Sequence, residues 1–337
     1  MKSLVGIFLL SWSAVIAAQP QAQTEAPEEI IVTGRLPGPA LWKVSNGENA
    51  LWIFAVVSPI PKDMEWESQR VEQVIAEADE YLEAPDVEVS ISPMVMLNPV
   101  NLLRGYRLLK RLQANPGKQS LQEVLPPELY QRFSALKAQY APHEKAVEKM
   151  RPLFAVGQIN ESILEQNGLT EIDDVIERIN LLIKRNRTII RTSTEVTMTM
   201  EGGFGDLAGR AEAMVSSLPF DKELACMERQ LVRYESDIKE MRSRANSWAQ
   251  GHVDELRDMP LPGESDDPCL VMVMGSSESQ TMAEIELQSQ HAWLAAADKA
   301  LANNQSTFAV LGISDLLSET GLLAQLKAKG YAVREPQ

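Results

Sequence analysis

The sequence predicts an α+β domain in which short β-sheets are built from both ends of the chain and the middle is largely helical. Apolar strand patterns occupy residues 40–58 near the start and 306–335 at the end. Between them, apolar residues recur every three or four positions, as in helices that pack on one face. At 45% hydrophobic and 23% charged in 337 residues, the composition is globular. We therefore expect a single domain over residues 39–335.

The segment before this domain predicts an export signal followed by a spacer. Lys2 precedes an apolar core over 4–16, and small residues place cleavage near Ala18. That core is too short to span a membrane, and no later stretch reaches the ~18 apolar residues that a span needs. Residues 19–38 are typical of a disordered leader. We expect a periplasmic or secreted protein with a signal peptide at 1–18 and no membrane span.

A hairpin is predicted over residues 40–58, where ALWKVS and ALWIFAVVS flank NGEN. Asn46-Gly47 favours a tight turn between the two strands. The second strand is apolar on both faces, which is typical of a strand inside a sheet that is covered on both sides. Pro59 cannot donate to a sheet ladder, so the strand ends at Ser58. Strand ends often carry reactive side chains, which makes Ser58 a candidate site residue.

The middle of the chain predicts helices broken by two strands. In order, we expect a helix over 66–83, a strand over 86–92, a helix from its cap at Asn98 to Gln113, helical segments over 120–140 and 143–166, a helix capped by Thr170, and a strand over 188–200.

The strongest periodic pattern lies in residues 222–250. Apolar residues alternate spacings of three and four there, at Leu224, Met227, Leu231, Tyr234, Ile238, Met241, Ala245 and Trp248. This pattern predicts a long helix packed on neighbouring helices, and a coiled coil with a partner stays open.

The cysteines are Cys226 and Cys269. In an exported chain this pair predicts one disulfide, with two buried free thiols as the alternative.

The C-terminal residues 306–335 predict a βαβ unit, with a buried strand to Gly312, a helix that ends at Gly330 and a final strand. Both chain ends thus have an apolar strand, a short polar turn and then a helix. We expect one sheet to bring the two turns to the same edge, where a site would form.

Charge and motifs argue against several functional classes. With 32 basic and 47 acidic residues the net charge is −15, which argues against nucleic acid or an anionic membrane as a partner. His143, His252 and His291 lack a second histidine at ligand spacing, so no zinc motif is present. The sequence GGFGDLAG lacks the spacing of a dinucleotide-binding loop, and no GxSxG nucleophile motif occurs.

Several segments resemble the TraB/GumN family, which is related to TIKI-type metalloproteases. The hairpin ALWKVSNGENALWIFAVVS resembles the family's opening segment, and STFAVLGISDLLSETGLLAQLKAKGYAV resembles its closing segment. RPLFAVGQ (151–158) and RANSWAQGHVDELRDMP (244–260) are similar to two of its helices. The resemblance covers nearly all of the mature chain and implies a TraB/GumN-like fold.

The same resemblance implies that the metal-binding residues have changed. In active members two Gly-x-x-His turns and an acidic residue hold a divalent metal for hydrolysis. The first histidine falls on Ser58, the second on Asp315, and the acidic residue near Glu83. The family's Arg-Asn pair falls on Ser289-Gln290. The resemblance therefore implies the fold without both histidines and the arginine.

Three functional hypotheses follow. The first is an exported pseudoenzyme that needs no cofactor and binds or scaffolds a protein or peptide partner. The second is a metal-dependent hydrolase or peptidase in which Ser58, Glu83 and Asp315 form an altered site, with an oxygen-preferring divalent metal on the carboxylates. The third is an accessory protein of envelope polysaccharide or outer-membrane receptor systems, since EEIIVTGR (28–35) is similar to the plug segment of TonB-dependent receptors. The sequence names neither the partner nor the oligomeric state.

Overall fold

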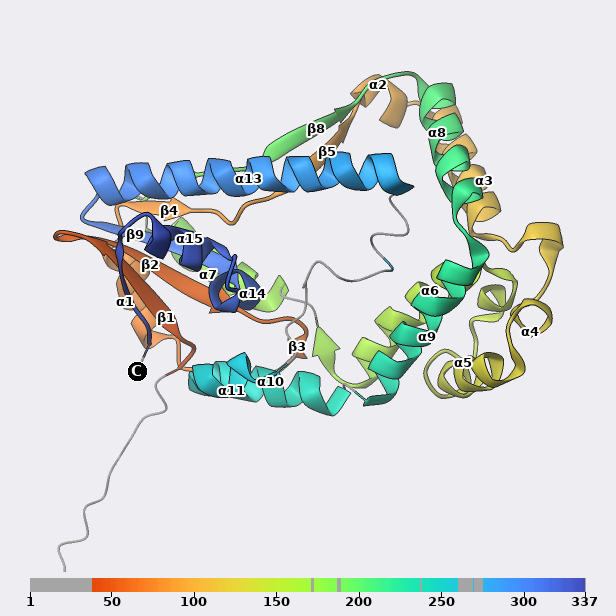
Figure 1. Cartoon of the computed structure of the whole chain (residues 1–337), viewed down its shortest axis with the longest axis horizontal. Coiled ribbons are helices and arrows are strands. Elements are labelled where there is room, and N and C mark those ends of the chain that lie inside the picture. Colours follow the sequence, from red (N-terminus) through yellow and green to blue (C-terminus); the bar gives the residue numbers. More distant parts are fainter. Residues whose placement is uncertain are drawn as a thin grey trace, which may run out of the picture. The chain divides into compact units, whose positions relative to one another are not determined.

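The computed structural model of the chain describes residues 38–336, apart from 171–172, 187–188, 237, 260–268 and 270–274 (Figure 1). The described residues belong to one compact unit that begins at Leu36. They confirm the predicted α+β class. The expected signal peptide, most of the leader and the 28–35 segment lie outside the described residues.

The elements have the following bounds. The described strands are β1 (Leu41–Asn46), β2 (Asn49–Val56), β3 (Ile60–Pro61), β4 (Glu80–Leu82), β5 (Val87–Ile91), β6 (Leu169–Thr170), β7 (Ile190–Thr192), β8 (Val196–Met200), β9 (Ser306–Gly312) and β10 (Ala332–Arg334). The described helices are α1 (Gln69–Glu77), α2 (Pro93–Met96), α3 (Pro99–Gln113), α4 (Leu121–Val124), α5 (Pro127–Tyr140), α6 (Pro152–Gln166), α7 (Asp173–Arg185), α8 (Phe204–Ser217), α9 (Phe220–Ser236), α10 (Ile238–Gln250), α11 (Val253–Arg257), α13 (Gly275–Asn303), α14 (Ile313–Leu317) and α15 (Leu322–Ala328), with short 3-10 helices at Pro116–Lys118 and Lys145–Lys149. Among these helices, none combines the length and the apolar character needed to cross a bilayer.

The main sheet takes strands from both ends of the chain, in the order β10-β1-β2-β9-β4-β7 among the described residues (Figure 1). The predicted hairpin is confirmed as β1 and β2, with Asn46 opposite Asn49. Gly47 and Glu48 close it, and Gly47 has the positive φ of +62° that a two-residue loop requires. β2 pairs in parallel with β9, and Val56 lies opposite Gly312 at the far end of the ladder.

The βαβ unit predicted at the C-terminus is confirmed in part, because its two strands are not neighbours in the sheet and the single predicted helix is two helices. β9 is parallel to β2, whereas β10 is antiparallel to β1, and β1 is antiparallel to β2. Strands β9 and β10 therefore run in the same direction, with the N-terminal hairpin between them. Helices α14 and α15 form the connection.

Two segments differ from the sequence prediction because strand pairing overrides the local pattern. The helix expected over 66–83 ends at Glu77, and Glu80–Leu82 instead form β4 between β9 and β7. Leu82 fits a helical spacing, but parallel pairing on both sides of β4 buries it completely in the sheet. The strand expected over 188–200 is two strands, of which β7 joins the main sheet and β8 pairs with β5.

Two helix starts also differ from the prediction. The expected helix over 143–166 begins only at Pro152, after a 3-10 turn, because proline suits the first helical position and not the interior. Thr170, expected as a helix cap, lies in β6 and pairs with Ile60.

The heptad residues of 222–250 pack inside the chain. Met227, Leu231 and Tyr234 on α9 belong to a core formed with α5 and α6. Ala245 and Trp248 on α10 belong to the core that surrounds the main sheet. Helices α9 and α10 thus connect the two cores, and the apolar stripe is not a coiled-coil surface for a partner.

Candidate functional site

The two turns that the sequence predicted to meet do lie at the same edge of the main sheet. Val56 ends β2 opposite Gly312 at the end of β9, and the two strands are parallel. Ser58 and the turn that carries Asp315 therefore follow neighbouring strand ends. The indole Nε1 of Trp248 donates to the Ala55 carbonyl at 2.7 Å and fixes the end of β2 to α10.

Asp315 lies in α14 directly after this edge. Burial raises the pKa of its carboxyl, while a hydrogen bond from the Gly312 backbone N–H opposes the rise. The turn is tightly packed, since a Cβ on Gly321 would lie 2.3 Å from the Asp315 carbonyl oxygen. The Asp315 side chain is thus held close to its own turn.

Glu83 follows β4 and is engaged elsewhere. Leu82 pairs with Ala309, so Glu83 is level with Val310 and short of the strand end at Gly312. The Arg191 Nε donates to the Glu83 carboxylate at 3.0 Å, and the two side chains form an ion pair. The Arg191 guanidinium also stacks over the Tyr81 ring at 5.4 Å. The structure therefore brings Ser58 and Asp315 to one edge and keeps Glu83 in a separate ion pair.

These residues do not fit the divalent metal that the resemblance implies. Ser58 offers a neutral hydroxyl, the Asp315 carboxyl is stabilised in its protonated form by burial, and Arg191 neutralises Glu83. Within the described residues, no group of three or more His, Cys, Asp or Glu side chains is arranged to hold a metal ion. The histidines at 143, 252 and 291 are all exposed.

Ser289 stands where the resemblance places an arginine, and it lies away from the two turns. It is buried, and its hydroxyl donates to the Asp86 carbonyl at 3.0 Å, next to β5. Its role is to join α13 to the strand that follows β4.

A cavity of about 370 Å³ opens beside Ser58. Its walls come from the turn after β2 and from helices α6, α9 and α10. The described residues that line it are Ser58, Pro59, Leu153, Val156, Gly157, Asn160, Leu164, Cys226, Gln230, Arg233, Tyr234, Met241 and Cys269.

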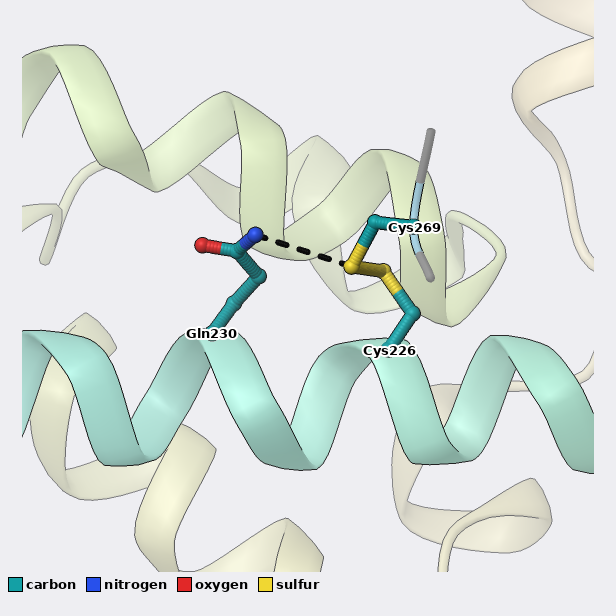
Figure 2. The surroundings of a disulfide bond; sticks show 3 residues. All are labelled: Cys226, Gln230 and Cys269. Carbon is teal, nitrogen blue, oxygen red and sulfur yellow. Dashed lines mark hydrogen bonds between the residues drawn. A yellow bond between two sulfur atoms is a disulfide. The ribbon is translucent and has the colours of Figure 1, made fainter. Parts of the chain in front are cut away.

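The disulfide predicted between Cys226 and Cys269 is confirmed and forms part of this wall. Figure 2 shows Gln230 one turn along α9, with its amide pointing at the disulfide. The Gln230 Nε2 donates to the Cys269 Sγ at 3.5 Å. The disulfide thus brings a residue of the segment after α11 against α9 at the cavity.

The sequence prediction missed the polar side chains of this cavity. Cys226, Gln230 and Arg233 are spaced by four and three, so they lie on one face of α9 beside the apolar stripe. That spacing was readable in the sequence. Asn160 on α6 has no comparable signal, since only the packing of α6 on α9 places it at the cavity.

The cavity offers hydrogen-bonding groups and a cation, and none of its described lining residues is Asp, Glu or His. General acid–base catalysis needs a side chain that exchanges protons near the working pH. Ser58, Asn160, Gln230 and Arg233 instead suit recognition of carbonyl or carboxylate oxygens. The described lining thus offers groups that can bind a polar ligand.

A model of the TraB/PrgY/gumN family matches residues 40–335. Neither the curated proteins nor the solved structures contain a significant match to the chain.

Proposed function

The chain belongs to the TraB/PrgY/gumN family, and we propose that it is an exported member that binds a peptide or protein and does not cleave it. The proposal rests mainly on the residues present at the two turns and on the ion pair of Glu83. Ser58 and Asp315 stand where the resemblance places histidines, and Glu83 is occupied by Arg191. A hydrolytic metal would need these positions as ligands, and their chemistry does not supply them.

The cavity beside Ser58 is the proposed binding site. Its volume of about 370 Å³ falls in the range of ~300–1,000 Å³ that is usual for ligand pockets. Arg233 has no ion-pair partner within the described part of the chain. A ligand with a carboxylate would pair with this guanidinium, and the apolar wall at Leu153 and Val156 would receive a side chain. A peptide with a free C-terminus combines these groups.

Export is supported by the disulfide and by the predicted signal peptide. Disulfides persist in oxidising compartments such as the periplasm and the extracellular space. The Cys226–Cys269 bond therefore agrees with the expected cleavage near Ala18.

An altered hydrolase is the second candidate, and one observation favours it. Ser58 and Asp315 do reach the same sheet edge, and burial raises the pKa of the Asp315 carboxyl. Buried acids with raised pKa values are frequent among catalytic groups. In this reading Asp315 donates or accepts the proton next to Ser58.

One experiment separates the two candidates. The untagged, processed protein is assayed for bound metal and for cleavage of a peptide panel with and without Mg²⁺, Mn²⁺ or Zn²⁺. The same panel is tested for thermal stabilisation, with each peptide present as the free C-terminal acid and as the amide. Binding to the native state raises the melting temperature by mass action.

We expect stabilisation by the acids and not by the amides, no metal-dependent cleavage, and loss of the stabilisation in Arg233→Gln. Metal-dependent cleavage that disappears in Asp315→Ala would establish the hydrolase instead. Absence of both cleavage and stabilisation would contradict the peptide-binding site.

The accessory hypothesis depends on residues 28–35, which lie outside the described residues. It remains a prediction, and a receptor-complex pull-down that is unchanged when these residues are deleted would refute it.

A further inference from the structure

Exposed large apolar side chains gather in one part of the molecule. In the described chain, those between β5 and the end of α3 are Val89, Met94, Leu97, Val100, Leu102, Leu103, Tyr106 and Leu109. Met94 is 87% exposed and Leu97 79% exposed. Scattered exposed apolar residues are normal, but a contiguous group marks an interaction surface. The remaining exposed large apolar residues of the described chain are dispersed over α7, β7, α9 and α13.

Helix α3 packs by one side only. Its partly buried residues lie toward α8, and a Cβ on Gly105 would be in ordinary van der Waals contact with the Phe204 ring, at 3.6 Å. No residue of α3 is fully buried. Figure 1 shows α3 and α8 side by side, with α2 next to them. An apolar groove of about 450 Å³ runs between the two helices, and Leu102 and Tyr106 form its rim on α3.

The outward face of α3 is apolar along one stripe and basic along the next. At 100° per residue, Leu102, Tyr106 and Leu109 form a stripe beside the groove. Lys110 lies between this stripe and Leu103, and Arg107, Arg111 and Arg104 follow on the other side of Leu103. Helix α3 contains no acidic residue.

Most of this basic charge is not neutralised within the described residues. Arg111 pairs with Glu212 on α8, and Lys110 lies 5.5 Å from the centre of the Tyr106 ring. Arg104 and Arg107 have no ion-pair partner in the part of the chain that the structure describes. Helix α8 adds Arg210 to its acidic residues Asp206 and Glu212, so the two helices together remain positive.

We propose that α2 and α3 form a face that docks on the surface of a bilayer containing anionic phospholipid. Helices that lie in the membrane interface combine an apolar stripe with Lys and Arg. Here Met94, Leu97 and Leu103 enter the boundary of the acyl chains, and the arginines contact the lipid phosphates. The helix lies on the surface and does not cross the bilayer.

The net charge of −15 argues against an anionic membrane as a partner for the chain as a whole. At short range, however, the charge of the contacting face determines whether it is attracted to an anionic bilayer. At physiological ionic strength the Debye length is about 8 Å, while α3 alone is about 22 Å long. Acidic residues on other elements are therefore largely screened from a bilayer that touches α3. The sequence-level exclusion of an anionic membrane does not hold for this face.

The same charges disfavour a second copy of the chain as the occupant. Two α3 helices face to face would bring two rows of cations together, and neither helix carries an acid to separate them. Like charges held across an interface lower affinity and oppose encounter. An anionic bilayer complements both features of α3, since its acyl chains match the apolar stripe and its negatively charged head groups match the basic residues.

The test uses the full processed chain and co-sedimentation with vesicles of phosphatidylcholine alone or with phosphatidylglycerol added. We expect binding to the anionic vesicles only, and a steep loss of binding as salt is raised. In Arg104→Gln with Arg107→Gln, vesicle affinity falls about tenfold or more, since each basic residue near a charged surface contributes substantially. In Leu103→Ser with Tyr106→Ser, it falls to the level seen with phosphatidylcholine.

Matched controls are Lys184→Gln with Arg185→Gln for the charge change, and Leu181→Ser with Leu287→Ser for exposed apolar residues elsewhere. All four variants alter exposed positions, and circular dichroism checks that each is folded. Vesicle binding that is absent, or that the α3 variants and their controls share equally, would refute the proposal. A dimer in sedimentation velocity that Leu103→Ser with Tyr106→Ser dissociates, without vesicle binding, would assign the face to a second copy.

Discussion

Asp315 is an acid in a place that favours its neutral form. It lies in α14 against a turn that admits only glycine at position 321, and burial raises the pKa of its carboxyl. The Gly312 N–H partly compensates by donating to the carboxylate. At neutral pH the folded protein therefore holds an acid whose ionisation it disfavours.

The sign of the pH effect follows from this raised pKa. Stability contributed by a neutral carboxyl is fully present below the unfolded pKa of about 3.9 and is lost as the pH rises through the folded pKa. Asp315→Asn keeps an acceptor and removes the ionisation. We expect a higher melting temperature than wild type at pH 7, with the difference shrinking toward pH 3.

Calorimetric scans over this pH range measure the difference, with Glu319→Gln as the control for an exposed acid in the same segment. A wild type that is more stable than Asp315→Asn at pH 7 would show that the carboxylate has a stabilising partner.

At the scale of elements, the Cys226–Cys269 bond fixes one point of the segment after α11 to α9. The two cysteines are 43 residues apart, and Cys226 and Cys269 are both buried next to Leu218. This bond closes a covalent loop in the chain, and it also forms part of the wall of the cavity beside Ser58. Stability and the shape of the proposed binding site are therefore coupled.

Removing this bond should destabilise the fold and open the cavity. In the chain-entropy description, a loop of this length stabilises by about 4 kcal/mol. We expect Cys226→Ser with Cys269→Ser to lower the free energy of unfolding by up to that amount, measured by urea denaturation. Dithiothreitol should lower the stability of wild type and leave the double variant unchanged. Equal sensitivity of both proteins to the reductant would contradict this account.

At the scale of the whole molecule, the main sheet requires both ends of the chain. β9 lies between β2 and β4, so a strand from the last tenth of the sequence fills the centre of a sheet begun near residue 41. The side chains of β9 are buried on both faces of the sheet, as are those of β2. Neither end forms a complete sheet alone.

Truncation tests this dependence. A chain of residues 38–335 contains every described strand, and we expect it to unfold at the melting temperature of the processed full chain. A chain of residues 38–303 lacks β9 and β10, exposes the edges of β2 and β4, and should show no cooperative transition. Cooperative unfolding of the shorter chain would mean that the helical core with α5, α6 and α9 folds independently.

The sequence predicted elements best where local chemistry decides them. Asn98 caps α3 by accepting from the Val100 N–H at 2.9 Å, and Gly47 closes the hairpin, both as expected. It failed at β4, because a three-residue strand has too few side chains to show its own period. The site was predicted in part, since the strand-end turns were found and the polar wall at Asn160 was not.

The sequence by itself determined the two apolar strand ends, the cysteine pair, the heptad stripe and the serine and aspartate of the two turns. These follow from residue types and from the short spacings between them along the chain. Only the tertiary structure decided which partner each face meets. It paired Glu83 with Arg191 and joined the buried Glu223 to Arg151, 72 residues apart. It also left the apolar and basic face of α3 uncovered, because burial depends on contacts between segments that sequence distance does not encode.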